Sequence, residues 1–418
     1  MRHLAGRHAR SLLVLLLWPG LAAGQTSAPP PSPSPSPAPA GSSLTLDEAL
    51  ALARSSPTIT AARLRRAVDK AGIDVAREFP NPDARYERAK ETPHESLALS
   101  QLVEIGKRSR RIRVAEAVAR TGEAELAQTE AEVAAEVYLA FFGLAGVQRR
   151  AEVAGELQDL AARARDTARA RYEVGDVSRL DVLQADLLFD QAENEATALE
   201  GERAGARAEL NVLIGRDLDA PTVASERIDL ATLEPAAATA IALQSNTALA
   251  VLDRQVDEAR ARAALARAQR IPDPTVEGTV THLAEPEFTW GYRWAVAVAV
   301  PIFTRHNAQV RVEEATVALT LAQREALAQR IRAAVASAAY RAAAARAGYL
   351  RYRDEILPKS REVEAMAQES YRAGQTNLVA LLQSLQAARE LRARALQAAA
   401  DFEAALAALR QAMTAPPK

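Results

Sequence analysis

The sequence contains no cysteine among its 418 residues. This absence excludes disulfide bonds, thiolate metal sites, a cysteine nucleophile and the lipid attachment of lipoproteins. Aromatic residues are also scarce, at 4%, although 49% of the chain is hydrophobic. Much of that hydrophobic share is alanine, which together with Glu, Arg, Gln and Leu favours long, closely packed helices over a large globular core.

An excess of charge and the motifs of catalytic sites are missing as well. The formal net charge is −1, which gives no reason to expect nucleic acid as a partner. The sequence has no Gly-rich phosphate loop, nucleophile elbow or paired-carboxylate signature. His94, His282 and His306 have no carboxylate or cysteine partner at ligand spacing, so no metal site is expected. We therefore predict that the protein is not an enzyme and holds no cofactor.

The first 43 residues predict an exported protein. A basic start, the apolar run SLLVLLLW and the small residues Ala22 and Gly24 have the layout of a signal peptide, residues 1–24, cleaved near Gly24. The Pro/Ser-rich stretch at 25–43 cannot bury a core and is expected to be a linker. No later stretch is expected to cross a membrane as a helix, so contact with a membrane would need another architecture.

Beyond residue 43 the sequence repeats itself. YEVGDVSRLDVLQ (172–184) returns as YRAGQTNLVALLQ (371–383), FPNP (79–82) as IPDP (271–274), and RVAEA (113–117) as RVEEA (311–315). The two copies occupy 44–222 and 223–413, which is a far longer period than that of a solenoid. The sequence therefore predicts two duplicated units.

Each unit is predicted to be mostly helical. Thr45 and Glu48 have the spacing of a capping box, which opens a helix that ends near Arg77, before Pro80. The further helices are expected at 106–173, from the turn at Gly175 to Gly215, at 236–270, at 307–372 with a kink or break at Pro358, and at 377–412.

Alternation of apolar and polar residues predicts a pair of strands between the first and second helix of each unit. The four strands are expected at 83–90, 95–105, 275–281 and 292–302, with Gln101 as an interruption of one apolar face. Strands of this length with one apolar side fit a transmembrane barrel, and three copies would supply the strands that one chain lacks. Soluble hairpins packed on helices are the alternative, but aromatic residues at 290–294 favour a membrane interface.

The ordered set of signal peptide, two copies of helix, hairpin, long helix, turn and helix, and a Tyr-x-x-Gly sequence at each turn resembles the TolC-like outer-membrane efflux factors over 44–413. The resemblance implies a mainly α fold with a transmembrane β part. A homotrimer would close a 12-stranded barrel in the outer-membrane lipid of a Gram-negative cell and extend a long α-helical tunnel into the periplasm. It would dock onto a periplasmic adaptor (membrane fusion protein) and an inner-membrane RND-type pump.

The motif QLVEIGKRSRRIR (101–113) resembles the heavy-metal cation branch of this family. Export of drugs or general export is the competing function within the family. A periplasmic coiled-coil adaptor or scaffold is the competing class of protein, but it would not need four amphipathic strands.

The resemblance also implies roles for single residues. It places the two turns at the periplasmic tip, where the adaptor would bind: Tyr172, Gly175, Asp176, Val177 and Ser178, and Tyr371, Gly374, Gln375, Thr376 and Asn377. The two glycines are expected to take a positive φ. Asp181 matches a gate aspartate of the family. The alternative is that Asp181 is an ordinary exposed charge. Ala380, Gln383 and Thr376 depart from the family's gate and latch residues, so the sequence does not show how the tip is closed.

The strand pattern assigns the two faces of the sheet. The residues expected to face lipid are Val276, Val280, Tyr292, Trp294, Val296 and Val298, and those expected to face the lumen are Glu277, Thr279 and Arg293. The basic residues Lys107, Arg108, Arg110, Arg111 and Arg113 are expected to form a solvated helix start, with contact to lipid headgroups or a role in the lumen field as the alternatives.

Overall fold

The computed structural model describes residues 42–225, 231, 233–284, 286, 288–373, 375–376 and 378–414. The predicted signal peptide, its cleavage site and most of the predicted linker lie outside these residues. So do Gly374 and Asn377 of the second predicted turn.

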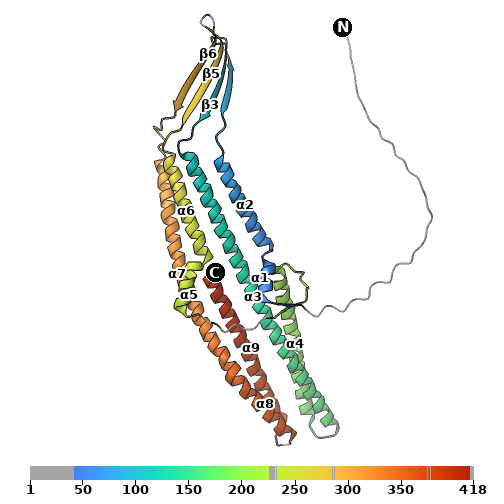
Figure 1. Cartoon of the computed structure of the whole chain (residues 1–418). Coiled ribbons are helices and arrows are strands. Elements are labelled where there is room, and N and C mark those ends of the chain that lie inside the picture. Colours follow the sequence, from blue (N-terminus) through green and yellow to red (C-terminus); the bar gives the residue numbers. More distant parts are fainter. Residues whose placement is uncertain are drawn as a thin grey trace, which may run out of the picture. The chain divides into compact units, whose positions relative to one another are not determined.

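The same order of elements occurs twice (Figure 1). The first half contains α1 (Leu46–Ala53), α2 (Pro57–Arg77), β2 (Asp83–Arg88), β3 (Glu95–Leu102), α3 (Lys107–Glu173) and α4 (Arg179–Leu213). The second half contains α5 (Pro235–Ser245), α6 (Thr247–Ala268), β5 (Pro274–Ala284), β6 (Phe288–Val298), α7 (Asn307–Arg351), a π-helix (Tyr352–Ile356), α8 (Leu357–Arg372) and α9 (Leu378–Thr414). The predicted succession of helix, hairpin, long helix, turn and helix is therefore confirmed in both halves.

The first helix of each half is divided in two, whereas the sequence pattern predicts one continuous helix. The capping box at Thr45 is present, because the Thr45 N–H donates to the Glu48 carboxylate at 2.9 Å. A second cap follows at Ser56, with Pro57 as the first residue of α2. In the other half the Asn246 side chain caps α6 by accepting hydrogen bonds from two backbone N–H groups. Strong caps inside an apolar pattern thus end one helix and begin the next.

One apolar stretch, Pro235–Ala268, is long and apolar enough by composition to cross a membrane, contrary to the prediction that no stretch after the signal peptide would be. It is divided at Asn246, and its two helices α5 and α6 pack on α7. Composition alone is weak support for a membrane span, because the core helix of a helical bundle passes the same test.

The long helices pack around two apolar clusters. One cluster includes Phe141, Leu144 and Leu210, and the other includes Ile331 and Phe402. An ion pair joins the two halves, because Arg149 on α3 lies 2.5 Å from the Glu403 carboxylate on α9. Burial raises the pKa of Glu403, and the hydrogen bond from Arg149 opposes this shift.

The helix that runs from α7 to α8 is not broken at Pro358. Instead, the π-helix Tyr352–Ile356 ends two residues before Pro358. Proline removes an N–H donor and crowds the preceding turn, and a single π-helical turn is one way in which a helix accommodates such a residue.

The described strands form two sheets. The larger sheet is antiparallel throughout and has the order β2-β3-β5-β6, so the two predicted hairpins lie side by side (Figure 1). The predicted strand 292–302 lies at 288–298 instead. A small parallel sheet of β1 (Ser42–Leu44) and β4 (Thr222–Ala224) was not predicted, because three-residue strands carry no period to detect.

Candidate functional site

The larger sheet has one apolar and one polar face. Residues that face each other across neighbouring strands share a side of the sheet. Leu97, Val280 and Tyr292 form one such row, and Leu99, Gly278 and Trp294 form the next. The predicted alternation of sides is therefore confirmed across β3, β5 and β6. Which of the two faces meets lipid stays a prediction.

The apolar face is exposed in the single chain. Tyr292 is 91% exposed and Trp294 76% exposed, although both are aromatic. Further exposed members of this face are Tyr86, Leu97, Leu99, Val276, Val280, Val296 and Val298. Contiguous apolar surface of this kind marks a site of contact with a partner or with a membrane.

A row of polar and aromatic residues borders the apolar face at the hairpin-loop end of the sheet. Arg88, Glu95, His282 and Trp290 face each other in turn across the four strands. The Glu95 carboxylate lies 3.8 Å from Arg88 and 3.4 Å from the His282 ring, which packs on Trp290. This carboxylate belongs to another strand, far from His282 in sequence, so spacing along the chain did not indicate the contact. Among the described residues no cluster of metal-ligating side chains occurs.

The opposite face carries the polar residues. Glu277, Thr279 and Arg293 share this side, and the Thr279 hydroxyl donates a hydrogen bond of 3.2 Å to the Glu277 carboxylate. Gln101, which interrupts the apolar pattern of β3, has its amide turned to the backbone. It donates to the carbonyls of Pro80 and Leu102 at 2.9 and 3.0 Å. Gln101 therefore holds the connection between α2 and β2 in place through its bond to Pro80.

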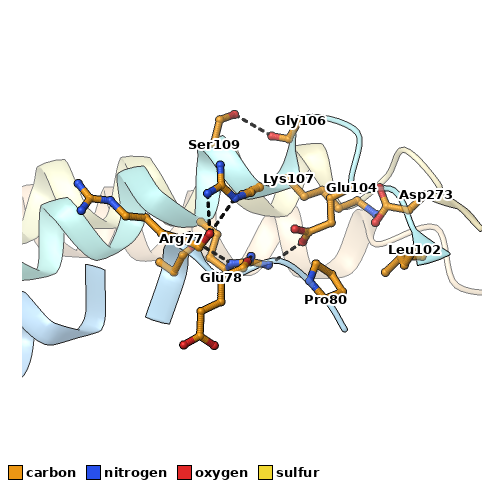
Figure 2. Close-up of polar contacts among 12 residues, drawn as sticks. Arg77, Glu78, Pro80, Leu102, Glu104, Gly106, Lys107, Ser109 and Asp273 are labelled. Carbon is orange, nitrogen blue, oxygen red and sulfur yellow. Dashed lines mark hydrogen bonds and ion pairs between the residues drawn. The ribbon is translucent and has the colours of Figure 1, made fainter. Parts of the chain in front are cut away.

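The basic run after β3 fixes the junction between the sheet and the helices (Figure 2). Arg108 donates two hydrogen bonds to the Arg77 carbonyl and packs on the Phe79 ring. Arg111 donates to the carbonyls of Ala76 and Glu78 at 3.1 and 2.7 Å. These carbonyls belong to the end of α2, which otherwise has unsatisfied acceptors. The expectation of a merely solvated helix start was therefore wrong for these two arginines.

The same junction joins the first half to the second. The Asp273 carboxylate accepts a hydrogen bond of 2.9 Å from the Ile105 N–H and another of 2.9 Å from the Lys107 ammonium (Figure 2). Lys107 and Asp273 are only 18% and 11% exposed, so water screens this ion pair less than the surface pairs. Gly106 lies between the two donors with a φ of 72°, which favours glycine. The IPDP motif and the basic run are both visible in the sequence, but their contact is not, because they lie far apart along the chain.

The first predicted tip turn joins α3 to α4. Gly175 has a φ of 78°, as predicted, and the Asp176 N–H bonds the Arg171 carbonyl at 2.9 Å. This is the bond of a Schellman motif, which ends a helix at a residue with positive φ. Arg171 also forms an ion pair with the Asp176 carboxylate. Tyr172 is about half exposed, and the turn lies at the end of the helices remote from the sheet (Figure 1).

Asp181 takes part in the cap of the next helix. Its carboxylate accepts hydrogen bonds from the Ser178 hydroxyl and N–H at 2.6 and 2.9 Å, and its N–H bonds the Ser178 hydroxyl. These bonds, that of the hydroxyl first, lower the pKa of Asp181. Asp181 therefore has a structural role in this chain as part of the cap of α4. Its predicted part in a gate is a separate matter and stays a prediction.

The second predicted turn joins α8 to α9 and has the same bond. The Gln375 N–H bonds the Ser370 carbonyl at 2.8 Å, and these two residues correspond to Asp176 and Arg171 in the repeated sequence. Gln375 and Thr376 are exposed. The conformation of Gly374 and Asn377 and the side chain of Tyr371 lie outside the description. Both turns lie at the same end of the helices (Figure 1).

Known proteins share this fold and sequence pattern. Residues 48–216 and 239–415 match the family described as outer membrane efflux protein. The chain is 27% identical over 393 residues to the cobalt-zinc-cadmium resistance protein CzcC of Cupriavidus metallidurans, which covers 92% of this chain and 93% of that protein. The solved structure of CusC is similar with a TM-score of 0.73 at 14% identity, covering 92% of this chain and 96% of the other. The outer membrane protein VceC from Vibrio cholerae is similar with a TM-score of 0.71 at 16% identity, covering 88% and 95%. The predicted fold class is therefore confirmed.

Proposed function

The chain belongs to the outer membrane efflux protein family, and we propose from this premise that three copies form the exit channel of a tripartite efflux system. The protein is an outer-membrane protein whose helices extend into the periplasm. In the proposed assembly the channel is passive. An inner-membrane RND-type pump delivers the substrate, and a periplasmic adaptor connects the pump to the channel.

The observation that carries this proposal is the apolar face of the four-stranded sheet. Its aromatic and aliphatic side chains are exposed in one chain, and the outer edges of β2 and β6 pair with no strand among the described residues. Lipid would cover the face, and other copies would pair the edges. About eight strands are the smallest number that closes a barrel, so one chain cannot close it and three copies would supply twelve. In this arrangement Val296 and Trp294 face lipid, and Glu277, Thr279 and Arg293 face the lumen.

The tip turns are the proposed contact with the adaptor. Both turns present exposed polar residues, which include Asp176 and Ser178 in the first and Gln375 and Thr376 in the second. Three copies would present six similar turns in a ring. The shared bond to the last turn of the preceding helix supports this pseudo-sixfold arrangement.

The proposed substrate is a heavy-metal cation. The similarity to a cobalt-zinc-cadmium resistance protein over most of both chains supports this class, as does the motif at 101–113. The alternative is the export of drugs or other compounds, because selectivity in such an assembly would lie mostly with the pump. The second alternative, a periplasmic adaptor or scaffold, does not account for the apolar face.

Two experiments test the proposal. After high-salt and carbonate washing, the protein should stay with the outer membrane, whereas release into the supernatant would favour a periplasmic scaffold. A deletion strain should lose resistance to cobalt, zinc or cadmium and regain it with the cloned gene. Unchanged metal resistance with new sensitivity to drugs would favour the alternative substrate class.

A further inference from the structure

We propose that the internal repeat sets the strand register between neighbouring copies, so that Val296 faces Tyr86 of the partner subunit and Trp294 faces Arg88 of the partner subunit. The inference rests on the proposed trimer and adds its residue-level seam. Its basis is that the chain contains one seam between its two hairpins, β3 with β5, and leaves the edges of a second seam, β6 and β2, unpaired among the described residues.

The repeated motifs define which residues correspond. Asn81 in FPNP matches Asp273 in IPDP, so Ala84 matches Val276 along the following strand. In the first hairpin Ala84 faces Leu99, and in the second hairpin Val276 faces Val296. Leu99 therefore corresponds to Val296.

The same step along the strands gives the second correspondence. Tyr86 faces Leu97, and its counterpart Gly278 faces Trp294. Leu97 therefore corresponds to Trp294, and the next alternate residue on β2, Arg88, corresponds to Val280.

The seam inside the chain can now be transferred to the seam between copies. Leu99 faces Gly278 within the chain, and their counterparts are Val296 and Tyr86. Leu97 faces Val280, and their counterparts are Trp294 and Arg88. A barrel built from repeats of one hairpin would use one register at both kinds of seam.

The transferred register agrees with the chemistry of the faces. It places Val296 against an aromatic ring on the apolar side, as in a favourable cross-strand pair. It also places the Arg88 guanidinium, which is largely exposed in the single chain, beside the Trp294 indole, where a cation–π contact is available. A register shifted by one residue would bring apolar and polar faces together.

The geometry of a closed barrel also fits. Ala84 on β2 faces Leu99 on β3, which in turn faces Gly278 on β5. Gly278 lies two residues beyond Val276, the counterpart of Ala84, so the register shifts by two residues over two strands. One residue of shift per strand is also the ratio of the TIM barrel, whose shear of 8 over eight strands gives a tilt of about 36°. That tilt is within the usual range of about 35–45° for barrels.

Cysteine cross-linking tests the register, since the natural chain has no cysteine. The facing pairs are V296C with Y86C and W294C with R88C. The matched controls shift Val296 by one alternate position in either direction: V296C with A84C and V296C with R88C. Outer membranes are oxidised mildly and run without reductant, and native mass spectrometry of the reduced protein reports the oligomer independently. Disulfides need Cα atoms within about 4.4–6.8 Å, whereas diagonal neighbours have Cα atoms about 7–8 Å apart.

Both facing pairs should give covalent dimers and trimers, with several-fold less product in the two shifted controls. Equal or greater cross-linking in a shifted pair would overturn the register. Trimers that cross-link through none of these pairs would overturn the β6–β2 seam while leaving the proposed channel in place. A monomer by native mass spectrometry would instead contradict the proposed trimer itself.

Discussion

The two ends of the helical body are stabilised in different ways. At the sheet end, large apolar side chains such as Tyr292 and Trp294 point away from the chain. At the tip, the polar groups of the turn are satisfied by close neighbours in sequence, as in the bond from Asp176 to Arg171. We therefore expect the sheet end to depend on its surroundings for its stability, whereas the turn at the tip depends on local backbone geometry. Changes at the sheet should damage assembly, and changes at the tip should damage function in assembled protein.

The largest expected effect comes from a charge on the apolar face. Val296→Arg should reduce membrane-inserted trimer, because an arginine that faces lipid costs up to about 2–4 kcal/mol, with the highest values at the midplane, in each of three copies. Ala297→Arg is the matched control on the opposite face, where it pairs with Thr275, and it should assemble far better. The amount of membrane-inserted trimer is measured from the heat-modifiable bands of outer-membrane fractions on a gel. Equal damage from both variants would contradict the assigned faces.

The junction between sheet and helices should give the next effect. Asp273→Ala removes the acceptor of the Ile105 N–H and of the Lys107 ammonium. Leaving these half-buried donors without a partner should destabilise the fold by about 1–3 kcal/mol. Asp74→Ala is the control, since Asp74 forms an exposed pair within one helix, and it should change the melting temperature little. A melting temperature for Asp273→Ala as high as that of the control would remove the structural role of this junction.

A smaller effect on stability, with a large effect on export, is expected at the first turn. Gly175→Val forces a non-glycine residue into the left-handed region at a cost of about 1–2 kcal/mol, although no atom lies near the added Cβ. Gly155→Val is the control, because Gly155 also has free space around it but lies within the helix α3. Both variants should reach the membrane as trimers, and only Gly175→Val should lose export of metal cations. Normal export by Gly175→Val at wild-type trimer levels would exclude a docking role for this turn.

The smallest expected effect concerns Asp181. Asp181→Ala should raise the single-channel conductance of the isolated trimer in planar bilayers if the carboxylate helps to close the tip. Ser178→Ala is the matched control, because it removes the hydroxyl of the same cap and keeps the charge. A rise in Asp181→Ala alone would indicate a gate, and a rise in both variants would indicate fraying of α4. Unchanged conductance in both would leave Asp181 with its capping role only.

The pH dependence of this cap has a definite sign. The pKa of Asp181 is lowered in the folded chain, so its contribution is present at neutral pH and is lost as the pH falls through the lowered pKa. Acidification should therefore bring the wild-type conductance toward that of Asp181→Ala, which should itself respond less to pH.

The fold was largely predictable from the sequence because its signals are local and repeated. Capping residues, prolines and alternation located the helices and strands, and the Tyr-x-x-Gly repeat located both turns. The divided helices at Ser56 and Asn246 were missed because a cap inside an apolar period does not interrupt that period. The parallel pair β1–β4 joins segments far apart in sequence and too short for a pattern.

The candidate site was predictable only in part, for a related reason. The side of each strand residue follows from alternation, so the faces could be assigned. The contact of Lys107 with Asp273 depends on two distant segments meeting, and no local signal reports such a meeting. The same holds for the pairing of Arg149 with Glu403 across the two halves.

The most direct test of the account is whether the apolar face meets lipid. The chain has three tryptophans, and Trp18 lies in the predicted signal peptide, so Trp290→Phe leaves Trp294 as the fluorophore of the mature protein. In vesicles with brominated acyl chains, the fluorescence of Trp294 should be strongly quenched, and iodide in the water should quench it little. Strong quenching by iodide with none by brominated lipid would contradict the account.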